Sequence, residues 1–215
     1  MKAGTQAADL ALADAAISRA DPAFAAIVSR AGPCTMSWRR GGRRTHFESL
    51  ASSIVHQQLA GGAAAAIWAR TVALVPGRFA PEAVLSLDED ALRGAGLSGA
   101  KARAILDLAA RVVSGELRLA RIGALSDDAV VGELSQVWGV GRWTAEMFLI
   151  FQLGRLDVWP TGDLAVRNGY ARLHGLGSVP SPDELEARGE AYRPWRSVAA
   201  WYCWRAIELR PEGGR

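Results

Sequence analysis

Apolar residues recur along most of this chain at intervals of three and four, the spacing of one buried face of an α-helix. The pattern is clearest at Phe47, Leu50, Ala51, Ile54, Val55 and Leu59. No long segment alternates apolar and polar residues as a half-buried strand would. The pattern therefore predicts an all-α protein.

Capping residues divide this pattern into helices. Asp21-Pro22 marks a helix start, and Ser181-Pro182-Asp183-Glu184 combines a capping box with proline at the first helical position. Asn168-Gly169 weakens one helix locally. We expect helices over 6–30 (one or two), 47–59, 63–75, 85–96, 99–113, 127–137, 144–151, 164–173, from 181 and from 194.

A chain of 215 residues is long enough to bury a proper core. We expect one functional unit, residues 1–215, built as two helical lobes with a cleft. Residues 80–175 would form a central lobe around a glycine-rich turn. The chain ends, residues 1–75 and 180–215, would pack together as the other lobe, since the central lobe lies between them in sequence.

Composition narrows the function classes only a little. Half of the residues are apolar, the net charge is +3 and the pI is about 9.2, which fits a globular protein that binds nucleic acid without demonstrating it. The basic stretch with Arg39, Arg40, Arg43 and Arg44 is either a solvated loop or an arm that faces phosphates.

The cysteine content and the hydropathy of the chain indicate the cellular compartment in which we expect the protein. Cys34 and Cys203 are too few for a four-cysteine metal or iron–sulfur site, and indicate buried thiols in a reducing cytoplasm. The N-terminal segment lacks the order of a signal peptide, and no apolar run approaches a membrane span. We expect a cytoplasmic protein, associated with the nucleoid in a prokaryote, that does not contact membranes.

The most informative stretch is Leu134-Ser135-Gln136-Val137-Trp138-Gly139-Val140-Gly141-Arg142-Trp143-Thr144-Ala145. Gly139 and Gly141 allow a sharp turn with φ > 0 and leave backbone N–H groups uncovered by side chains. The helix that follows adds unpaired N–H donors and a positive dipole end, which together suit a phosphate. The alternative is a helix–turn–helix corner without a ligand.

This helix, Gly-hydrophobic-Gly-Arg-x-Thr-Ala, helix pattern resembles the helix-hairpin-helix element of DNA repair glycosylases. About twenty residues further on stands Asp163, within Asp157-Val158-Trp159-Pro160-Thr161-Gly162-Asp163-Leu164-Ala165-Val166. The resemblance implies that Asp163 is catalytic and that Gly139, Gly141 and Thr144 bind DNA phosphate. By local sequence alone, Asp163 is equally a helix N-cap. The resemblance covers roughly residues 47–209, and its details are most similar to the alkylated-base branch, DNA-3-methyladenine glycosylase II.

Position 143 separates two chemistries. In relatives that also cut the DNA backbone, a lysine directly before the Thr-Ala of the hairpin forms a Schiff base. Here that residue is Trp143, which implies a monofunctional glycosylase. A tryptophan face would gain a cation–π energy of about 0.5–2 kcal/mol from a cationic alkylated purine. Trp204 matches the family's second pocket aromatic. The alternative is that both tryptophans belong to the core.

The segment Ser53-Ile54-Val55-His56-Gln57-Gln58 resembles the family segment that carries the DNA-penetrating wedge. It places Gln58 at the wedge, with Leu59 as the neighbouring candidate, to fill the gap that an evicted base leaves. The alternative is that Gln57 and Gln58 cap a helix end and face water. Lys101 is a candidate phosphate contact.

No divalent metal is expected, because three scattered histidines form no ligand cluster. Family members hold a monovalent cation with hairpin carbonyls, which match Ser135, Val137 and Val140; Gln136-Val137-Trp138 departs from the usual Leu-Pro-Gly there. We expect no other cofactor.

The sequence therefore predicts a monomeric glycosylase that releases alkylated purines such as 3-methyladenine and 7-methylguanine from double-stranded DNA. Two rivals remain. One is a non-catalytic helix-hairpin-helix DNA-binding protein, and the other is a glycosylase for other lesions.

Overall fold

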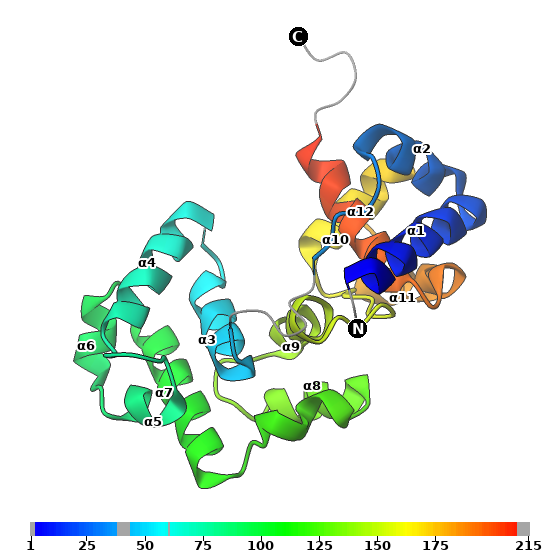
Figure 1. Ribbon diagram of the computed structural model, residues 1–215. Coiled ribbons are helices and arrows are strands. Elements are labelled where there is room, and N and C mark those ends of the chain that lie inside the picture. Colours follow the sequence, from blue (N-terminus) through cyan, green and yellow to red (C-terminus); the bar gives the residue numbers. More distant parts are fainter. Residues whose placement is uncertain (1–2, 38–43, 60, 210–215) are drawn as a thin grey trace. The chain divides into compact units, whose positions relative to one another are not determined.

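The computed structural model describes residues 3–37, 44–59 and 61–209, and all regular elements in these residues are helical (Figure 1). This confirms the all-α prediction. Within the described residues, no helix is long and apolar enough to cross a membrane. The chain forms two compact units: residues 1–37 with 155–215, and residues 38–154.

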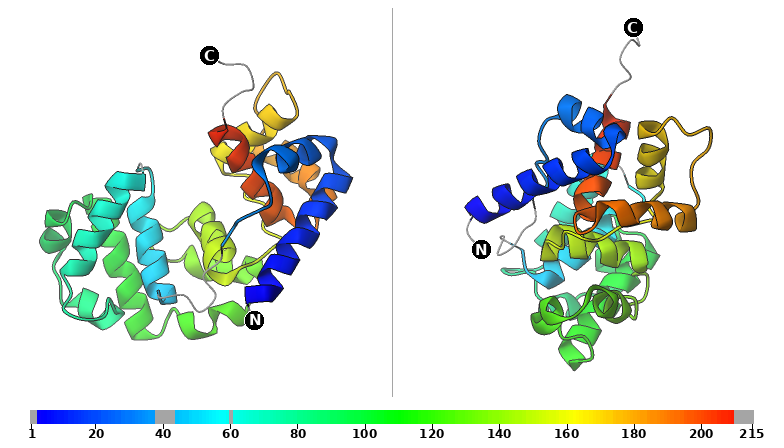
Figure 2. Two further views of the ribbon diagram at one scale, coloured as in Figure 1. Left: turned by 45° about the horizontal axis from the view of Figure 1, so that its top comes forward. Right: turned by 90° about the vertical axis from the view of Figure 1, so that its right-hand side faces the viewer.

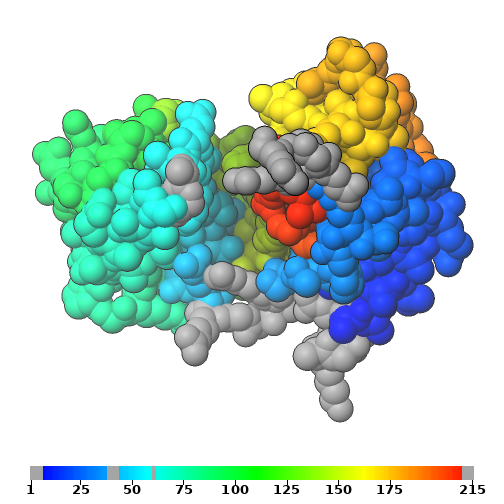
Figure 3. All heavy atoms as spheres, turned by 90° about the horizontal axis from the view of Figure 1, so that it is seen from above, coloured from blue at the N-terminus to red at the C-terminus, as the bar shows by residue number. Residues whose placement is uncertain are grey.

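The first unit joins the two ends of the chain. It contains α1 (Ala3–Ala20), α2 (Pro22–Ala31), α10 (Leu164–Leu173), α11 (Pro182–Gly189), the 3₁₀ turn η3 (Glu190–Tyr192) and α12 (Arg196–Glu208). α12 packs against α10, α2 and α1 (Figures 2 and 3). As predicted, Asp21 starts α2 by accepting a hydrogen bond from the Ala23 backbone N–H at 2.8 Å.

Gly169 sets how closely α10 approaches α12. A Cβ built at this residue would lie 2.0 Å from the backbone oxygen of Cys203, so only glycine fits. The Asn168-Gly169 pair that weakens α10 locally is therefore the place where two helix backbones touch. Both cysteines are buried free thiols, as expected. Burial raises the pKa of Cys203, and the charge of Asp163 adds to this rise.

The second unit is organised around α3 (His46–His56), which packs on α4, α7, α9 and η1. Its other elements are α4 (Gly61–Ala73), α5 (Pro81–Leu85), α6 (Glu89–Gly94), α7 (Gly99–Ser114), the 3₁₀ helix η1 (Leu119–Ala124), α8 (Asp127–Leu134), α9 (Arg142–Phe148) and the π-helical turn η2 (Leu149–Leu153). The apolar face predicted at Phe47, Leu50, Ala51, Ile54 and Val55 is the buried face of α3, whereas Leu59 lies beyond the helix and is 39% exposed.

Several element boundaries differ from the prediction. The helix expected over 85–96 is the shorter α6, which the Asp88 side chain caps, whereas Leu85 ends a separate helix, α5, that starts at Pro81. α8 ends at Leu134, three residues before the expected end. α9 passes into a π turn, and α12 begins after Pro194 rather than at it.

The two units also divide the chain differently from the expected lobes. The chain ends do pack together, as expected. However, residues 44–75 belong with the hairpin and not with the chain ends, because α3 packs on α7 and α9. Residues 155–175 belong with the chain ends, because α10 packs on α12.

Candidate active site

α8 and α9 are joined by the predicted glycine turn. Gly139 has φ of 77° and the backbone N–H of Val140 donates to the Val137 carbonyl at 3.0 Å. Gly141 is the N-cap of α9 in an extended conformation, with φ of −96°, and no side chain caps the helix. The expectation of φ > 0 is therefore right for Gly139 and wrong for Gly141.

The surroundings of the two glycines differ. A Cβ at Gly139 would lie 3.2 Å from the Cβ of Ala104 on α7, whereas a Cβ at Gly141 would meet nothing within 4 Å. Gly139 is thus required by the protein's own backbone and packing. Gly141 is required by neither, and it leaves open space at the start of α9.

Gln57 connects the end of α3 to this hairpin. Its side-chain Nε2 donates to the Gly139 carbonyl at 3.2 Å and to Thr144 Oγ1 at 3.0 Å. Thr144 is only 2% exposed, so its hydroxyl faces the protein interior. Of the predicted phosphate contacts, Thr144 therefore has its hydroxyl turned toward Gln57 and not toward solvent.

A groove runs along the hairpin's backbone, lined by residues 135–141 together with Arg103, Asp107 and Arg111 of α7. The Arg103 guanidinium lies over the Trp138 ring, 4.4 Å from its centroid, and the Trp138 backbone N–H donates to Asp107 at 2.8 Å. The bulky Trp138, part of the departure from the family's usual lead-in, is thus held by α7. The predicted cation-binding carbonyls of Ser135, Val137 and Val140 belong to residues of this groove.

The predicted wedge residues are exposed at the end of α3. Gln58 has φ of 54°, and Leu59 is 39% exposed. Lys101 does not behave as the predicted phosphate contact: its ammonium donates to the carbonyls of Val55 at 2.8 Å and Gln57 at 2.6 Å, at the C-terminal end of α3. Desolvation by burial lowers the pKa of Lys101.

The basic stretch before α3 is described only in part. Arg39, Arg40 and Arg43 lie outside the described residues. Arg44 packs on its own unit, donating to Ser52 Oγ at 2.9 Å and lying 5.3 Å from the Trp68 ring centroid. The prediction that this stretch faces phosphates therefore does not hold for Arg44, because its side chain contacts Ser52 and Trp68 of its own unit.

Asp163 is the N-cap of α10 and is 8% exposed. Its Oδ1 accepts hydrogen bonds from the backbone N–H groups of Ala165 at 2.7 Å and Val166 at 3.1 Å. The carboxylate therefore lies where these two donors and the positive end of the α10 dipole converge. The local interpretation as an N-cap is correct, and it is compatible with a catalytic role.

The loop that leads to Asp163 is held by residues further along the chain. Ser197 at the start of α12 accepts from the Val158 N–H at 3.0 Å and donates to the Arg155 carbonyl at 2.8 Å. The Trp159 indole N–H donates to the Leu185 carbonyl at 2.8 Å. A carboxylate on so firmly held a loop is pre-organised.

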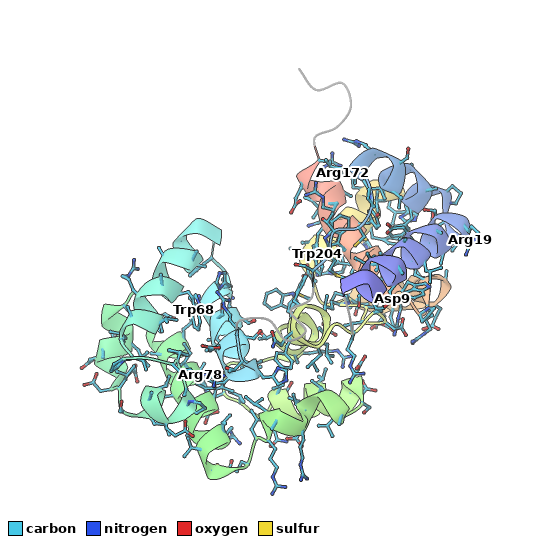
Figure 4. All side chains as sticks on the ribbon, viewed as in Figure 1. Asp9, Arg19, Trp68, Arg78, Arg172 and Trp204 are labelled. Atoms are coloured by element: carbon cyan, nitrogen blue, oxygen red, sulfur yellow. The ribbon has the colours of Figure 1, made fainter. Side chains whose placement is uncertain are left out.

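The tryptophans divide into core and surface. Trp68 and Trp159 are buried at 8% and 4% exposure, whereas Trp143, in the first turn of α9, is 40% exposed. Trp204 is partly buried on α12 (Figure 4). A core assignment therefore holds for Trp68 and Trp159 but not for Trp143.

Sequence reasoning missed the contacts of Gln57, Lys101 and Arg103. Gln57 meets its partners across separations of 82 and 87 residues, which no local pattern encodes.

Among the residues that the structure describes, no three His, Cys, Asp or Glu side chains gather as a metal site would require.

Comparison with known proteins supplies the wider context. Residues 51–194 match the family model described as HhH-GPD superfamily base excision DNA repair protein. DNA-3-methyladenine glycosylase 1 of Schizosaccharomyces pombe is 35% identical over 170 residues, which cover 78% of this chain and 75% of the relative.

Solved structures agree with this match. A 3-methyladenine DNA glycosylase of Schizosaccharomyces pombe, in complex with abasic DNA, superposes with a TM-score of 0.83 at 33% identity, over 92% of this chain and 97% of that one. A DNA-3-methyladenine glycosidase of Bacillus halodurans superposes with a TM-score of 0.77 at 35% identity, over 89% of this chain and 87% of that one. With the hairpin and the capped aspartate both in place, this chain belongs to the helix-hairpin-helix superfamily of base excision DNA repair proteins, among the relatives named DNA-3-methyladenine glycosylases.

Proposed function

We propose that this chain is a monofunctional DNA glycosylase that hydrolyses the N-glycosidic bond of alkylated purines, of the 3-methyladenine and 7-methylguanine type, in double-stranded DNA. The observation that carries the proposal is Asp163, a buried carboxylate at the start of α10 in a chain of this family. The relatives' names support the substrate class.

The chemistry needs one carboxylate. As the glycosidic bond breaks, the base leaves with the bonding electrons and the deoxyribose becomes cationic at C1′. Asp163 would stabilise this cation or take a proton from the water whose oxygen adds to C1′. Its Oδ1 is already aligned by two backbone N–H groups, at 2.7 and 3.1 Å, so little reorganisation is needed.

The hairpin would bind the DNA backbone without reading sequence. Gly141 contributes open space at the start of α9, where a phosphate could approach the backbone N–H groups. A monovalent cation, if bound, would be held by the carbonyls of Ser135, Val137 and Val140, and would add a positive charge next to that phosphate. Gln58 or Leu59 would fill the gap left by the evicted base.

Trp143 and Trp204 are proposed to stack on the evicted base. Trp143 occupies the position where lyases have a lysine, and it carries no amine that could form a Schiff base. The chain's two lysines are Lys2, outside the described residues, and Lys101, whose ammonium is bound to two carbonyls. The expected product is therefore an intact strand with an abasic site.

The test is base release from methylated duplex DNA, with the released bases separated by chromatography. We expect free 3-methyladenine and 7-methylguanine, an unbroken strand and no adduct after borohydride treatment. DNA binding without release of any base would favour the non-catalytic rival. Release of another damaged base alone would favour a different lesion specificity, and a borohydride-trapped adduct would overturn the monofunctional assignment.

Action as a monomer, in the cytoplasm, is part of the same proposal. The size of the active species during gel filtration with and without DNA tests the first point. Fractionation of cells that produce the protein tests the second.

A further inference from the structure

The segment after α3, residues 57–59, is here called the wedge loop. Its first residue, Gln57, is the C-cap of α3, and its second, Gln58, has φ of 54°. Among the described residues, Gln58 is the one non-glycine with positive φ. This conformation is disfavoured for residues with a Cβ, so neighbouring contacts must hold it.

Lys101 supplies the first contact. Its ammonium donates to the carbonyl oxygens of Val55 and Gln57, at 2.8 and 2.6 Å. The Gln57 carbonyl belongs to the peptide plane that directly precedes the Cα of Gln58. Fixing that oxygen therefore fixes one of the two planes that define the φ of Gln58. The cation also satisfies carbonyls at a helix C-terminus, where positive charge is favoured.

The Gln57 side chain supplies the second contact. It reaches the hairpin at the Gly139 carbonyl and Thr144 Oγ1, at 3.2 and 3.0 Å. Gly139 is in the turn and Thr144 is in the first turn of α9. The wedge loop is thus joined by side-chain hydrogen bonds to the same short element that would bind DNA phosphate.

We propose that Lys101 and Gln57 are positioning residues that hold Gln58 in its exposed conformation and in fixed register with the hairpin. Resting on the proposed function, this means that seating the hairpin on the DNA backbone sets where residue 58 enters the base stack. Neither side chain needs to touch DNA. Their contribution is to reduce the reorganisation required when a base leaves the stack.

The proposal makes a selective prediction. Loss of either contact should impair insertion into the stack much more than backbone binding. Lys101→Met removes the donor while keeping a side chain of similar length, and Gln57→Met does the same for the partly buried, neutral glutamine. Lys101→Arg keeps a cation that can donate to two carbonyls. Arg121→Met removes an exposed charge from the same unit and serves as the matched control.

The experiment uses a duplex with a tetrahydrofuran abasic analogue beside 2-aminopurine, whose fluorescence reports stacking. Wild-type protein and Arg121→Met should raise the fluorescence on binding, and Gln58→Ala should not. Lys101→Met and Gln57→Met should lose most of the rise, whereas Lys101→Arg should restore it. The affinity for this duplex and its salt dependence should stay within about threefold of wild type, because hairpin contacts remain.

The rate of base excision provides a second, independent measurement. For a lesion in a paired duplex, both methionine variants should slow single-turnover release on the order of 10-fold, as expected for lost hydrogen bonds to a charged or strained group. For the same lesion in a bulge, the loss should be much smaller. If both methionine variants show the fluorescence rise and the release rates of the wild-type protein, the proposal is overturned. It is also overturned if Lys101→Met makes the DNA affinity less dependent on salt concentration, because that change is the mark of a lost phosphate contact.

These outcomes are separable from the proposed function. If the fluorescence rise depends on Lys101 and Gln57 but the wild-type protein releases no base, the enzymatic assignment is wrong and the positioning role still stands. Should Lys101→Met fail to fold, as judged by thermal unfolding, Gln57→Met decides the matter alone.

Discussion

Replacing Asp163 in two ways separates its structural role from its proposed chemical role. Asp163→Asn keeps an oxygen that can accept from the Ala165 and Val166 N–H groups, now 2.7 and 3.1 Å away, but removes the charge. Asp163→Ala removes both. Asn and Asp are about equally good N-caps, so only the alanine variant should lose the cap.

The magnitudes differ accordingly. The asparagine variant should unfold within about 1 kcal/mol of wild type, and the alanine variant should lose about 0.5–2 kcal/mol. Catalysis should fall in both. Loss of a pre-organised group that stabilises transition-state charge costs on the order of 10²–10³-fold in rate, which is about 2.7–4 kcal/mol. Activity should therefore fall far more than stability in Asp163→Asn.

The assay is single-turnover release of 7-methylguanine from a duplex, measured beside thermal unfolding and binding to abasic-analogue DNA. Asp88→Asn is the matched control, since Asp88 caps α6 through a 2.7 Å bond from the Ala91 N–H and has no proposed chemical role. It should excise at the wild-type rate. If Asp163→Asn stays within about threefold of wild type in release, the carboxylate is not part of the mechanism.

Three further predictions concern the hairpin, the base stack and acid stability. Gly139→Val should destabilise the fold by about 1–3 kcal/mol, since φ is 77° and a Cβ meets Ala104 at 3.2 Å, whereas Gly141→Val should unfold like wild type in urea yet bind DNA more weakly, with or without a lesion. Loss confined to lesion-containing DNA would contradict a phosphate role. Trp143→Ala should slow excision of cationic 3-methyladenine more than of neutral hypoxanthine, by the cation–π energy of about 0.5–2 kcal/mol; equal losses would leave only stacking. Hydrogen bonds from Tyr192, His174 and the Ala23 N–H outweigh desolvation by burial and lower the pKa of Asp21, so its contribution to stability is present above the unfolded-state value near about 4 and is lost as pH falls through the folded-state value. Urea midpoints of Asp21→Asn should therefore be lower at pH 7 and depend less on pH in that acid range, and a parallel pH profile would refute this.

The sequence by itself determined what local chemistry controls. Helical periodicity predicted the all-α fold, and the capping box at Ser181 starts α11 as expected. Gly139 adopts the predicted positive φ, and Asp163 caps α10. Each of these depends on residues within about one helical turn, so a short stretch of sequence contains all the partners.

The tertiary structure decided whatever depends on partners far along the chain. Lys101 was expected at phosphate, but it caps α3 through carbonyls 46 and 44 residues away. Gln57 was expected to cap a helix end and face water; it is the C-cap of α3, but its side chain binds the hairpin. Gly169 looked like a weak point in α10, but it is where the backbone of Cys203 approaches.

The lobe boundaries follow the same rule. Two helices share a unit when their apolar faces pack against each other. An apolar stripe in the sequence shows that a helix face is buried, but it does not show which other helix covers that face. α3 carries such a stripe, and only its packing on α7 and α9 places residues 44–75 with the hairpin. Sequence periodicity fixes the helix, while complementarity between distant surfaces chooses its neighbours and so positions the side chains that act on a ligand.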